Sequence, residues 1–328
     1  MGKIPVSIIF DTDLETDCDD VGALCLLHNF QTAGLCAIKA VIGDGFSDYI
    51  APSAEVINAW FGRSEIPVGA LRIPGYVDDP TYEAYRRHIS MFEQSFPSRL
   101  YNRRLPTGTP YEGKKTEDYP DAVRIYRQVL AAAENDEVVV CVVGFMTALA
   151  GLLKSLPDDI SPLSGIELAT RKIQHVVSMA VVSPCPGEGN GNFNFYIDLP
   201  AAHFVVDNLP VPVYLSSWGT SITTGERFMA SVPAEHPGRL AYEMYLDNDL
   251  LTPPEGNRSS WDQVAALFSV LGEEKYFDVT RGFTLTSSGD EFEWVKIPGG
   301  RGDRYIKPRH EKEMEQVIED WMIGPSQI

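Results

Sequence analysis

The residues best suited to do chemistry form an acidic cluster near the start of the chain. Six carboxylate side chains fall within ten residues, in the run Asp11-Thr12-Asp13-Leu14-Glu15-Thr16-Asp17-Cys18-Asp19-Asp20. Carboxylates packed this closely repel one another and lose hydration when buried, unless a cation compensates their charge. Because the available ligands are all oxygens, Ca²⁺ or Mg²⁺ is favoured over zinc. The alternative is a solvated acidic loop that binds no metal.

Two other acidic motifs do not fit this run. An EF-hand loop that begins at Asp11 requires glycine and glutamate where the chain has Thr16 and Gly22. A D-x-D-x-T phosphatase motif of the haloacid dehalogenase type requires threonine where Glu15 stands, two residues after Asp13. The role of the acidic run therefore has to be inferred from its position in the predicted fold, because neither motif fits.

Strand and helix patterns alternate along the chain and predict where the cluster lies. Residues 6–10 form a short apolar run typical of a buried strand, and residues 21–29 have helical apolar spacing. Alternation of this kind predicts a single large α/β domain with a mostly parallel, open, Rossmann-like sheet and helices on both faces. Ligands bind beyond the carboxyl ends of the strands in such sheets. The acidic cluster follows the first strand, so it is expected at that edge.

The same patterns predict the remaining elements. A long excursion with prolines, aromatic residues and basic residues spans 72–116 and is a candidate lid. Alternating residues over 277–297 predict a hairpin that turns at 287–290, and 310–322 predicts a closing helix. The other expected strands are 35–42, 66–71, 138–143, 175–182 and 211–215, and the other expected helices are 54–61, 119–133 (opening on Pro120), 147–156 and 200–207. The segments that follow these strands are Gly43-Asp44, Val143-Gly144, 187–194 and Ser216-Ser217.

Composition excludes several classes of partner. The formal net charge is −19, and nucleic-acid binders and proteins that bind anionic membranes are normally basic. No apolar run approaches the ~18 residues that a membrane helix needs, and no signal peptide is recognised before residue 4, although an export signal could have been trimmed. The cysteines are odd in number and scattered, which favours reduced thiols and a cytoplasmic protein: Cys18, Cys25, Cys36, Cys141 and Cys185.

The strand followed by D-T-D, five residues and D-D resembles the first motif of the nucleoside hydrolase family. Asp11, Asp13, Asp19 and Asp20 match the four aspartates of that motif. Later segments match further family motifs in the same order, over roughly residues 5 to 270. These segments are Val142 to Ala150, Ser178-Met179-Ala180, Asn192 to Asp198, and Ser260-Trp261-Asp262. The first motif is fairly specific, and the others gain weight from their order.

The resemblance implies a Ca²⁺ site and a general base. Asp13 and Asp20 would be carboxylate ligands, the backbone carbonyl of Val143 a third ligand, and Asp262 would close the protein shell. The ribose 2′- and 3′-hydroxyls and one water would complete the coordination. Asp13 would also accept a proton from that water, a contribution typically worth about 10²–10⁴-fold in rate.

The resemblance also implies how the sugar is held. Asp19 would hydrogen-bond the ribose, and Asn192 and Asn194 would hold its 5′ and 3′ side. Asp44, where the family usually has asparagine, is a further candidate for the ribose edge. Asn192 replaces the more usual glutamate, which points to a substrate modified at the 5′ end; Glu188 is a candidate substitute for that carboxylate.

Leaving-group activation departs from the commonest family pattern. Many members place a histidine directly before the last aspartate, whereas this chain has Trp261. A tryptophan here is either a packing residue or, as we prefer, a platform on which a purine stacks, and we nominate no acid. Asp17 is either an extra carboxylate close to the metal or, as we prefer, a solvated side chain.

These observations predict Ca²⁺-dependent hydrolysis of a ribonucleoside to free base and ribose, with purines slightly preferred. The alternatives are hydrolysis of another or a modified riboside, and a catalytically silent, Ca²⁺-dependent nucleoside-binding protein. A metal-dependent phosphohydrolase is disfavoured because the motifs contain no lysine or arginine to hold a phosphate. The resemblance further implies a homodimer or homotetramer.

Overall fold

The structure is a computed structural model, and it describes residues 4–14, 17–45, 47–72, 114–180, 193–246, 256–288 and 291–325. Most of the predicted excursion, residues 73–113, lies outside the described residues. Among the residues that are described, nine strands form one large sheet in the order β10-β9-β11-β6-β5-β4-β1-β2-β3. Their bounds are β1 Val6–Thr12, β2 Cys36–Gly43, β3 Val68–Ala70, β4 Val138–Val142, β5 Ile173–Met179, β6 Val213–Ser216, β9 Phe277–Ser288, β10 Glu291–Val295 and β11 Asp303–Pro308.

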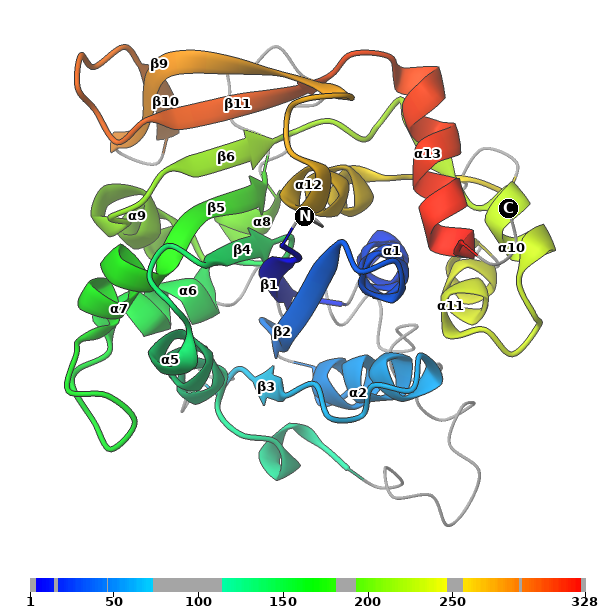
Figure 1. The fold of residues 1–328 in the computed structure, drawn as a ribbon, viewed down its shortest axis with the longest axis horizontal. Coiled ribbons are helices and arrows are strands. Elements are labelled where there is room, and N and C mark those ends of the chain that lie inside the picture. The colour runs from blue at the N-terminus through cyan, green and yellow to red at the C-terminus, as the bar shows by residue number, and fades with distance from the viewer. Residues whose placement is uncertain are drawn as a thin grey trace.

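The sheet is mostly parallel, as the alternation of strands and helices predicts. Each pairing from β11 through β6, β5, β4 and β1 to β2 and β3 is parallel, whereas β9 pairs antiparallel with both β11 and β10. The predicted hairpin is therefore present, and it extends one edge of the sheet (Figure 1). Ser287 and Ser288, expected in its turn, instead belong to β9, because Ser288 is registered opposite Glu291.

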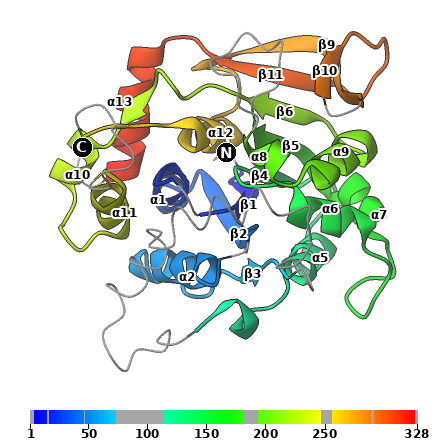
Figure 2. The same cartoon turned by 180° about the vertical axis from the view of Figure 1, so that it is seen from behind.

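Helices cover both faces of the sheet. In Figures 1 and 2, α1, α2, α11, α12 and α13 lie on one side, and α5, α6, α7 and α9 lie on the other. The helices are α1 Asp19–Thr32, α2 Ile50–Trp60, α5 Ala122–Ala132, α6 Thr147–Lys154, α7 Gly165–Lys172, α8 Phe193–Ile197, α9 Leu199–Asn208, α10 Glu226–Ser231, α11 Pro237–Leu246, α12 Trp261–Leu271 and α13 Glu311–Ile323, with a short 3₁₀ turn at η2 Thr116–Asp118.

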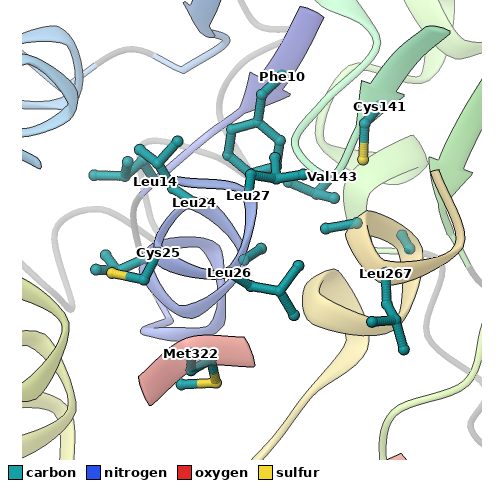
Figure 3. Packing of buried hydrophobic residues seen from close by; sticks show 14 of the residues in the cluster. Phe10, Leu14, Leu24, Cys25, Leu26, Leu27, Cys141, Val143, Leu267 and Met322 are labelled. Atoms are coloured by element: carbon teal, nitrogen blue, oxygen red, sulfur yellow. The ribbon is translucent and has the colours of Figure 1, made fainter. Parts of the chain in front are cut away.

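The apolar residues of the central strands explain this layering. Successive side chains of a strand point to opposite faces. In β1, Ile8 and Phe10 pack into the core beneath α1 and α12, whereas Ile9 packs into the core beneath α5 and α6. In Figure 3, α1 lies between Phe10 on one side and Leu267 of α12 and Met322 of α13 on the other. Because both cores are apolar, the central strands are continuous hydrophobic runs.

Several expected boundaries differ from those observed. α5 was expected to open on Pro120, but Asp121 caps it by accepting from the backbone N–H groups of Val123 and Arg124. The sequence patterns did not predict α7, α10, α11, α12 or β11, although Ser164 and Glu167 form a capping box at the start of α7. The predicted motif Trp261-Asp262 lies at the start of α12. A second, two-stranded sheet pairs β7 Thr223–Thr224 with β8 Arg258–Ser259.

Candidate functional site

The turn that follows β1 places the acidic cluster at the carboxyl edge of the sheet. Asp20 accepts hydrogen bonds from the Thr12 hydroxyl and, at 3.2 Å, from the backbone N–H of Leu14. Leu14 has a φ of 39°, a strained conformation for a residue with a side chain. Its side chain is fully buried, so the surrounding core holds the turn in place. Asp13 is only 4% exposed within this turn.

Two helix starts bring three carboxylates together. Asp19 and Asp20 occupy the first turn of α1, and Asp262 occupies the first turn of α12. Each of the three offers an oxygen, and these oxygens lie within 4.8 Å of one another; all three residues are 3% exposed. The Asp19 carboxylate also accepts a hydrogen bond from the Asp262 backbone N–H at 3.3 Å. The start of each helix favours nearby negative charge through its dipole.

The residues that the structure describes compensate the charge of these carboxylates only in part, through Arg258 beside Asp19. Burial, followed by the charges of Asp17 and Asp20, raises the pKa of Asp19 well above its usual value. Burial also raises the pKa of Asp20 to about 6. The pKa of Asp262 is raised by burial first and then by the charge of Asp19. Close, buried, oxygen-only ligands with raised pKa values fit a hard divalent cation, which would neutralise their mutual repulsion.

Asp13 lies beside the three clustered carboxylates. The predicted ligand set contained Asp13, whereas the three residues whose oxygens lie closest together include Asp19 instead. A hydrogen bond between Asp13 and Asp20 lowers the pKa of Asp20, and the charge of Asp13 raises that of Asp262. Asp13 is therefore near both of its expected fellow ligands. Its roles as ligand and general base remain predictions.

The end of β4 meets this turn closely, as the predicted carbonyl ligand requires. A side chain at Gly144 would collide with the backbone nitrogen of Asp13, so only glycine permits the approach. The Val143 carbonyl accepts a hydrogen bond from the Asn194 side-chain amide at 2.6 Å. The structure thus brings Asn194 to the Val143 carbonyl, which retains a second lone pair for a metal. Asn192 lies outside the described residues.

A second acidic layer lies behind the first. Asp11 and Asp44 are fully buried, and the Tyr126 hydroxyl donates to Asp11. Burial raises the pKa of Asp44 to about 7, and Asp44 accepts the backbone N–H of Ala148 at 2.9 Å at the start of α6. Asp44 therefore ties the end of β2 to α6. Its contact with the ribose edge stays a prediction.

The expectation that Asp17 is solvated is wrong. The Nε and Nη2 groups of Arg258 both bind the Asp17 carboxylate, with the Nε at 2.7 Å from one oxygen. The Asp17 side chain is only 15% exposed. The predicted site motifs contain no lysine or arginine. Arg258, three residues before Trp261, lies outside these motifs and supplies the positive charge that pairs with Asp17. Its separation of 241 residues from Asp17 explains why local patterns missed the pair.

Trp261 is held in place on several sides. Its indole N–H donates to the Thr220 hydroxyl at 3.2 Å, and the backbone of Gly219 packs directly against it. The guanidinium carbon of Arg258 lies over the ring, 4.9 Å from its centroid. Any base that stacks on Trp261 must use ring surface that Arg258 leaves uncovered.

Stabilisation by Ca²⁺ is expected to grow as the pH rises from about 5 to about 7. Asp20 has a folded-state pKa of about 6, so protons compete with the cation at the lower end of this range. The measurement is the difference between urea unfolding midpoints in Ca²⁺ and in EDTA across that range. A difference that is constant or falls with pH would contradict the acidic metal site.

The comparison with EDTA is needed because other groups titrate in the same range. Without a cation, the raised pKa values of Asp20 and Asp44 (about 6 and about 7) give stability that is lost as pH rises through them. The buried His28 and His175, with pKa values lowered to about 3 and about 4, act in the opposite direction up to the histidine pKa of the unfolded chain. The histidine contribution is the same in both conditions and cancels.

Comparison with solved structures shows the same fold over the whole chain. The effector protein XopQ, solved in complex with adenosine diphosphate ribose, has a TM-score of 0.68 at 13% identity and covers 100% of this chain and 96% of its own. The inosine-uridine preferring nucleoside hydrolase of Bacillus anthracis has a TM-score of 0.62 at 15% identity, with 97% of each chain covered. The purine-preferring ribonucleoside hydrolase of Gardnerella vaginalis has a TM-score of 0.64 at 13% identity, covering 97% of this chain and 98% of its own.

The sequence itself matches the pattern of one family over most of its length. The family described as inosine-uridine preferring nucleoside hydrolase matches residues 8–283, which include the acidic cluster, the end of β4 and the start of α12. No curated protein matches the chain in sequence. Among the described residues, no helix has the length and apolar character needed to cross a bilayer. The chain belongs to the inosine-uridine preferring nucleoside hydrolase family.

Proposed function

We propose that this protein hydrolyses the N-glycosidic bond of ribonucleosides, with purines slightly preferred, in a Ca²⁺-dependent reaction that releases free base and ribose. The observation that carries the proposal is the meeting of the buried carboxylates Asp19, Asp20 and Asp262 beside Asp13 at the carboxyl edge of the sheet. Family membership supports the reaction class. The nucleoside is the partner, and the strong negative charge of the chain argues against nucleic acid.

The cation would be held by Asp13, Asp20, Asp262 and the Val143 carbonyl. Asp19 lies close enough to contribute. When bound, Ca²⁺ supplies a fixed positive charge that orients sugar hydroxyls and makes a nearby water more acidic. Asp13 then accepts the proton of the water that attacks C1′. The buried carboxylates stabilise the positive charge that develops on the sugar ring as the base leaves.

Asn194 and Asp19 would orient the ribose. Asn194 is 7% exposed and held by the Val143 carbonyl, so its amide is fixed at the edge of the acidic cluster. Asp19 is fixed in the same way by the backbone N–H of Asp262. Trp261 would contact the base through the part of its ring that Arg258 does not cover. Fixed groups of this kind reduce the entropy cost of reaching the transition state.

A second candidate is hydrolysis of a modified riboside. Asn192 stands where the family usually has glutamate, which favours a substrate altered near the 5′ position. The similar fold of XopQ was solved with adenosine diphosphate ribose, a riboside extended at that end. A Ca²⁺-dependent binding protein without turnover is the remaining alternative.

We further propose a homodimer or homotetramer in the cytoplasm. The location is supported by the buried free thiols Cys18, Cys25, Cys36 and Cys141.

The first test is release of free base from inosine, adenosine, guanosine, uridine and cytidine, with Ca²⁺ and after chelation by EDTA. Turnover of purine nucleosides that EDTA abolishes is the expected result. Turnover of pyrimidine nucleosides alone would keep the reaction but overturn the purine preference. No turnover of any of the five by a protein that binds Ca²⁺ would favour the modified riboside or the binding protein.

A further inference from the structure

Arg258 is an arginine held rigidly at the rim of the acidic site. It lies on β8, and Asp17 binds its Nε and Nη2 groups. Its guanidinium lies over two rings, 4.9 Å from the centroid of Trp261 and 5.1 Å from that of Tyr245. Cation–π contacts and a two-point ion pair together fix the plane of the guanidinium.

One end of this guanidinium remains available. Among the described residues, Asp17 is the hydrogen-bond partner of Nε and Nη2, and the Nη1 group has none. The side chain is 26% exposed, so a ligand can reach it. The charge of Arg258 acts on Asp19, one of the three clustered carboxylates. The Arg258 guanidinium therefore lies at the edge of the site, over the Trp261 ring expected to contact the base, and Nη1 is its donor group without a partner among the described residues.

Asp17 keeps Arg258 from entering the acidic cluster. Without a partner, the guanidinium would be attracted to Asp19 and Asp20 and would compete with a divalent cation for them. The ion pair with Asp17 satisfies two of its nitrogen atoms and leaves the cluster to the metal. The pair is thus suited to hold a positive charge near the site without occupying it.

The reaction needs such a group, because a purine leaves poorly as an anion and the chain has tryptophan where many family members have histidine. His28, His175 and His203 have other partners in the fold, namely the Asn58 amide and the rings of Tyr214 and Phe292, respectively. Preorganised donors aimed at developing negative charge stabilise a transition state strongly in a partly dehydrated site.

We propose that Arg258 is a catalytic residue whose Nη1 group donates a hydrogen bond to the departing base, and that Asp17 is its positioning residue. The inference rests on the proposed hydrolase function. The C1′–N bond breaks and its electron pair moves onto the base, while the oxygen of the attacking water bonds to C1′. Asp13 takes one proton of that water, and the base receives its proton from solvent. Arg258 keeps all its protons, because a guanidinium does not deprotonate in proteins.

The test compares two substrates that differ in how much help the leaving group needs. Inosine releases a basic purine, whereas 4-nitrophenyl riboside releases a stable phenolate that needs no hydrogen bond. Arg258→Met is expected to slow inosine hydrolysis by about 10²-fold and to leave 4-nitrophenyl riboside hydrolysis roughly unchanged. Arg258→Lys should lose less, since it retains a cation, and Asp17→Asn should show a smaller loss with the same selectivity.

Arg304→Met is the matched control. Arg304 also lies over an aromatic ring, 4.7 Å from the centroid of Tyr214, and pairs with Glu273 at 3.8 Å, but it is on β11 rather than beside the acidic cluster. This variant should hydrolyse both substrates at the wild-type rate. Thermal unfolding of each variant establishes that it is folded, and Arg258→Lys carries the test if Arg258→Met does not fold.

The two hypotheses fail in different ways. If Arg258→Met slows both substrates equally, or slows neither, the role of Arg258 is overturned while the hydrolase function stands. If the wild-type protein releases nothing from inosine or from 4-nitrophenyl riboside, the proposed function is overturned and the role of Arg258 falls with it. A selective loss with inosine is the result expected.

Discussion

Replacing Asp13 by asparagine is expected to reduce base release from ribonucleosides by about 10²–10⁴-fold, the range typical for loss of a general base. Asparagine has nearly the same shape but cannot accept a proton from the attacking water. Asp13 is 4% exposed, and the substitution conserves the size of this buried side chain, so the variant is expected to fold. The measurement is the initial rate of base release at saturating nucleoside and Ca²⁺.

Binding of the nucleoside separates loss of the general base from loss of the whole binding site. Calorimetric titration of Asp13→Asn with inosine should still show binding if Ca²⁺ is held by the remaining ligands. Asp159→Asn is the control, since it removes an exposed carboxylate that pairs with Arg124 on the surface. Undiminished turnover in Asp13→Asn would rule out Asp13 as the base.

Replacing Asp262 by asparagine is expected to abolish stabilisation by Ca²⁺ together with turnover. In the wild-type protein, Ca²⁺ at about 100 times its Kd should stabilise the fold by about 2.7 kcal/mol. Asp262 supplies one of three clustered carboxylates, and its loss removes the only one that α12 brings to the trio. The measurement is the melting temperature with Ca²⁺ and with EDTA, for both proteins.

In EDTA, Asp262→Asn should be at least as stable as the wild-type protein. Burial and the charge of Asp19 disfavour the ionised Asp262, so a neutral amide relieves repulsion when no cation is present. Asp278→Asn, which removes an exposed carboxylate paired with Arg309, is the control and should keep the full Ca²⁺ response. A Ca²⁺-induced shift that survives in Asp262→Asn would place the cation elsewhere.

Local patterns predicted the central layers of this fold because both faces of the sheet are buried. The short apolar runs of β1 and β4 must be strands covered on both faces, and helices of matching apolar character follow them. Boundaries were less predictable. The start of α5, for example, depends on the Asp121 side chain accepting two backbone N–H groups rather than on Pro120.

The part of the candidate site that follows one strand could be predicted. The contacts between residues far apart in the sequence could not. Asp13, Asp19 and Asp20 come from a single run of sequence, and a run placed after a buried strand has to lie at the ligand-binding edge. Asp17 belongs to the same run, yet its environment was predicted wrongly. Its partner Arg258 lies 241 residues away, in a two-residue strand with no pattern of its own.

The sequence by itself determined the alternating α/β architecture, the family and the edge of the sheet at which acidic chemistry is possible. Periodicity and composition carry that information, because strand and helix faces are set by neighbouring residues. The tertiary structure decided which groups meet there. α12 brings Asp262 to Asp19, 243 residues earlier in the chain, and β8 sets Arg258 against Asp17 and Trp261. Contacts over such separations depend on how whole helices and strands pack, which no local pattern records.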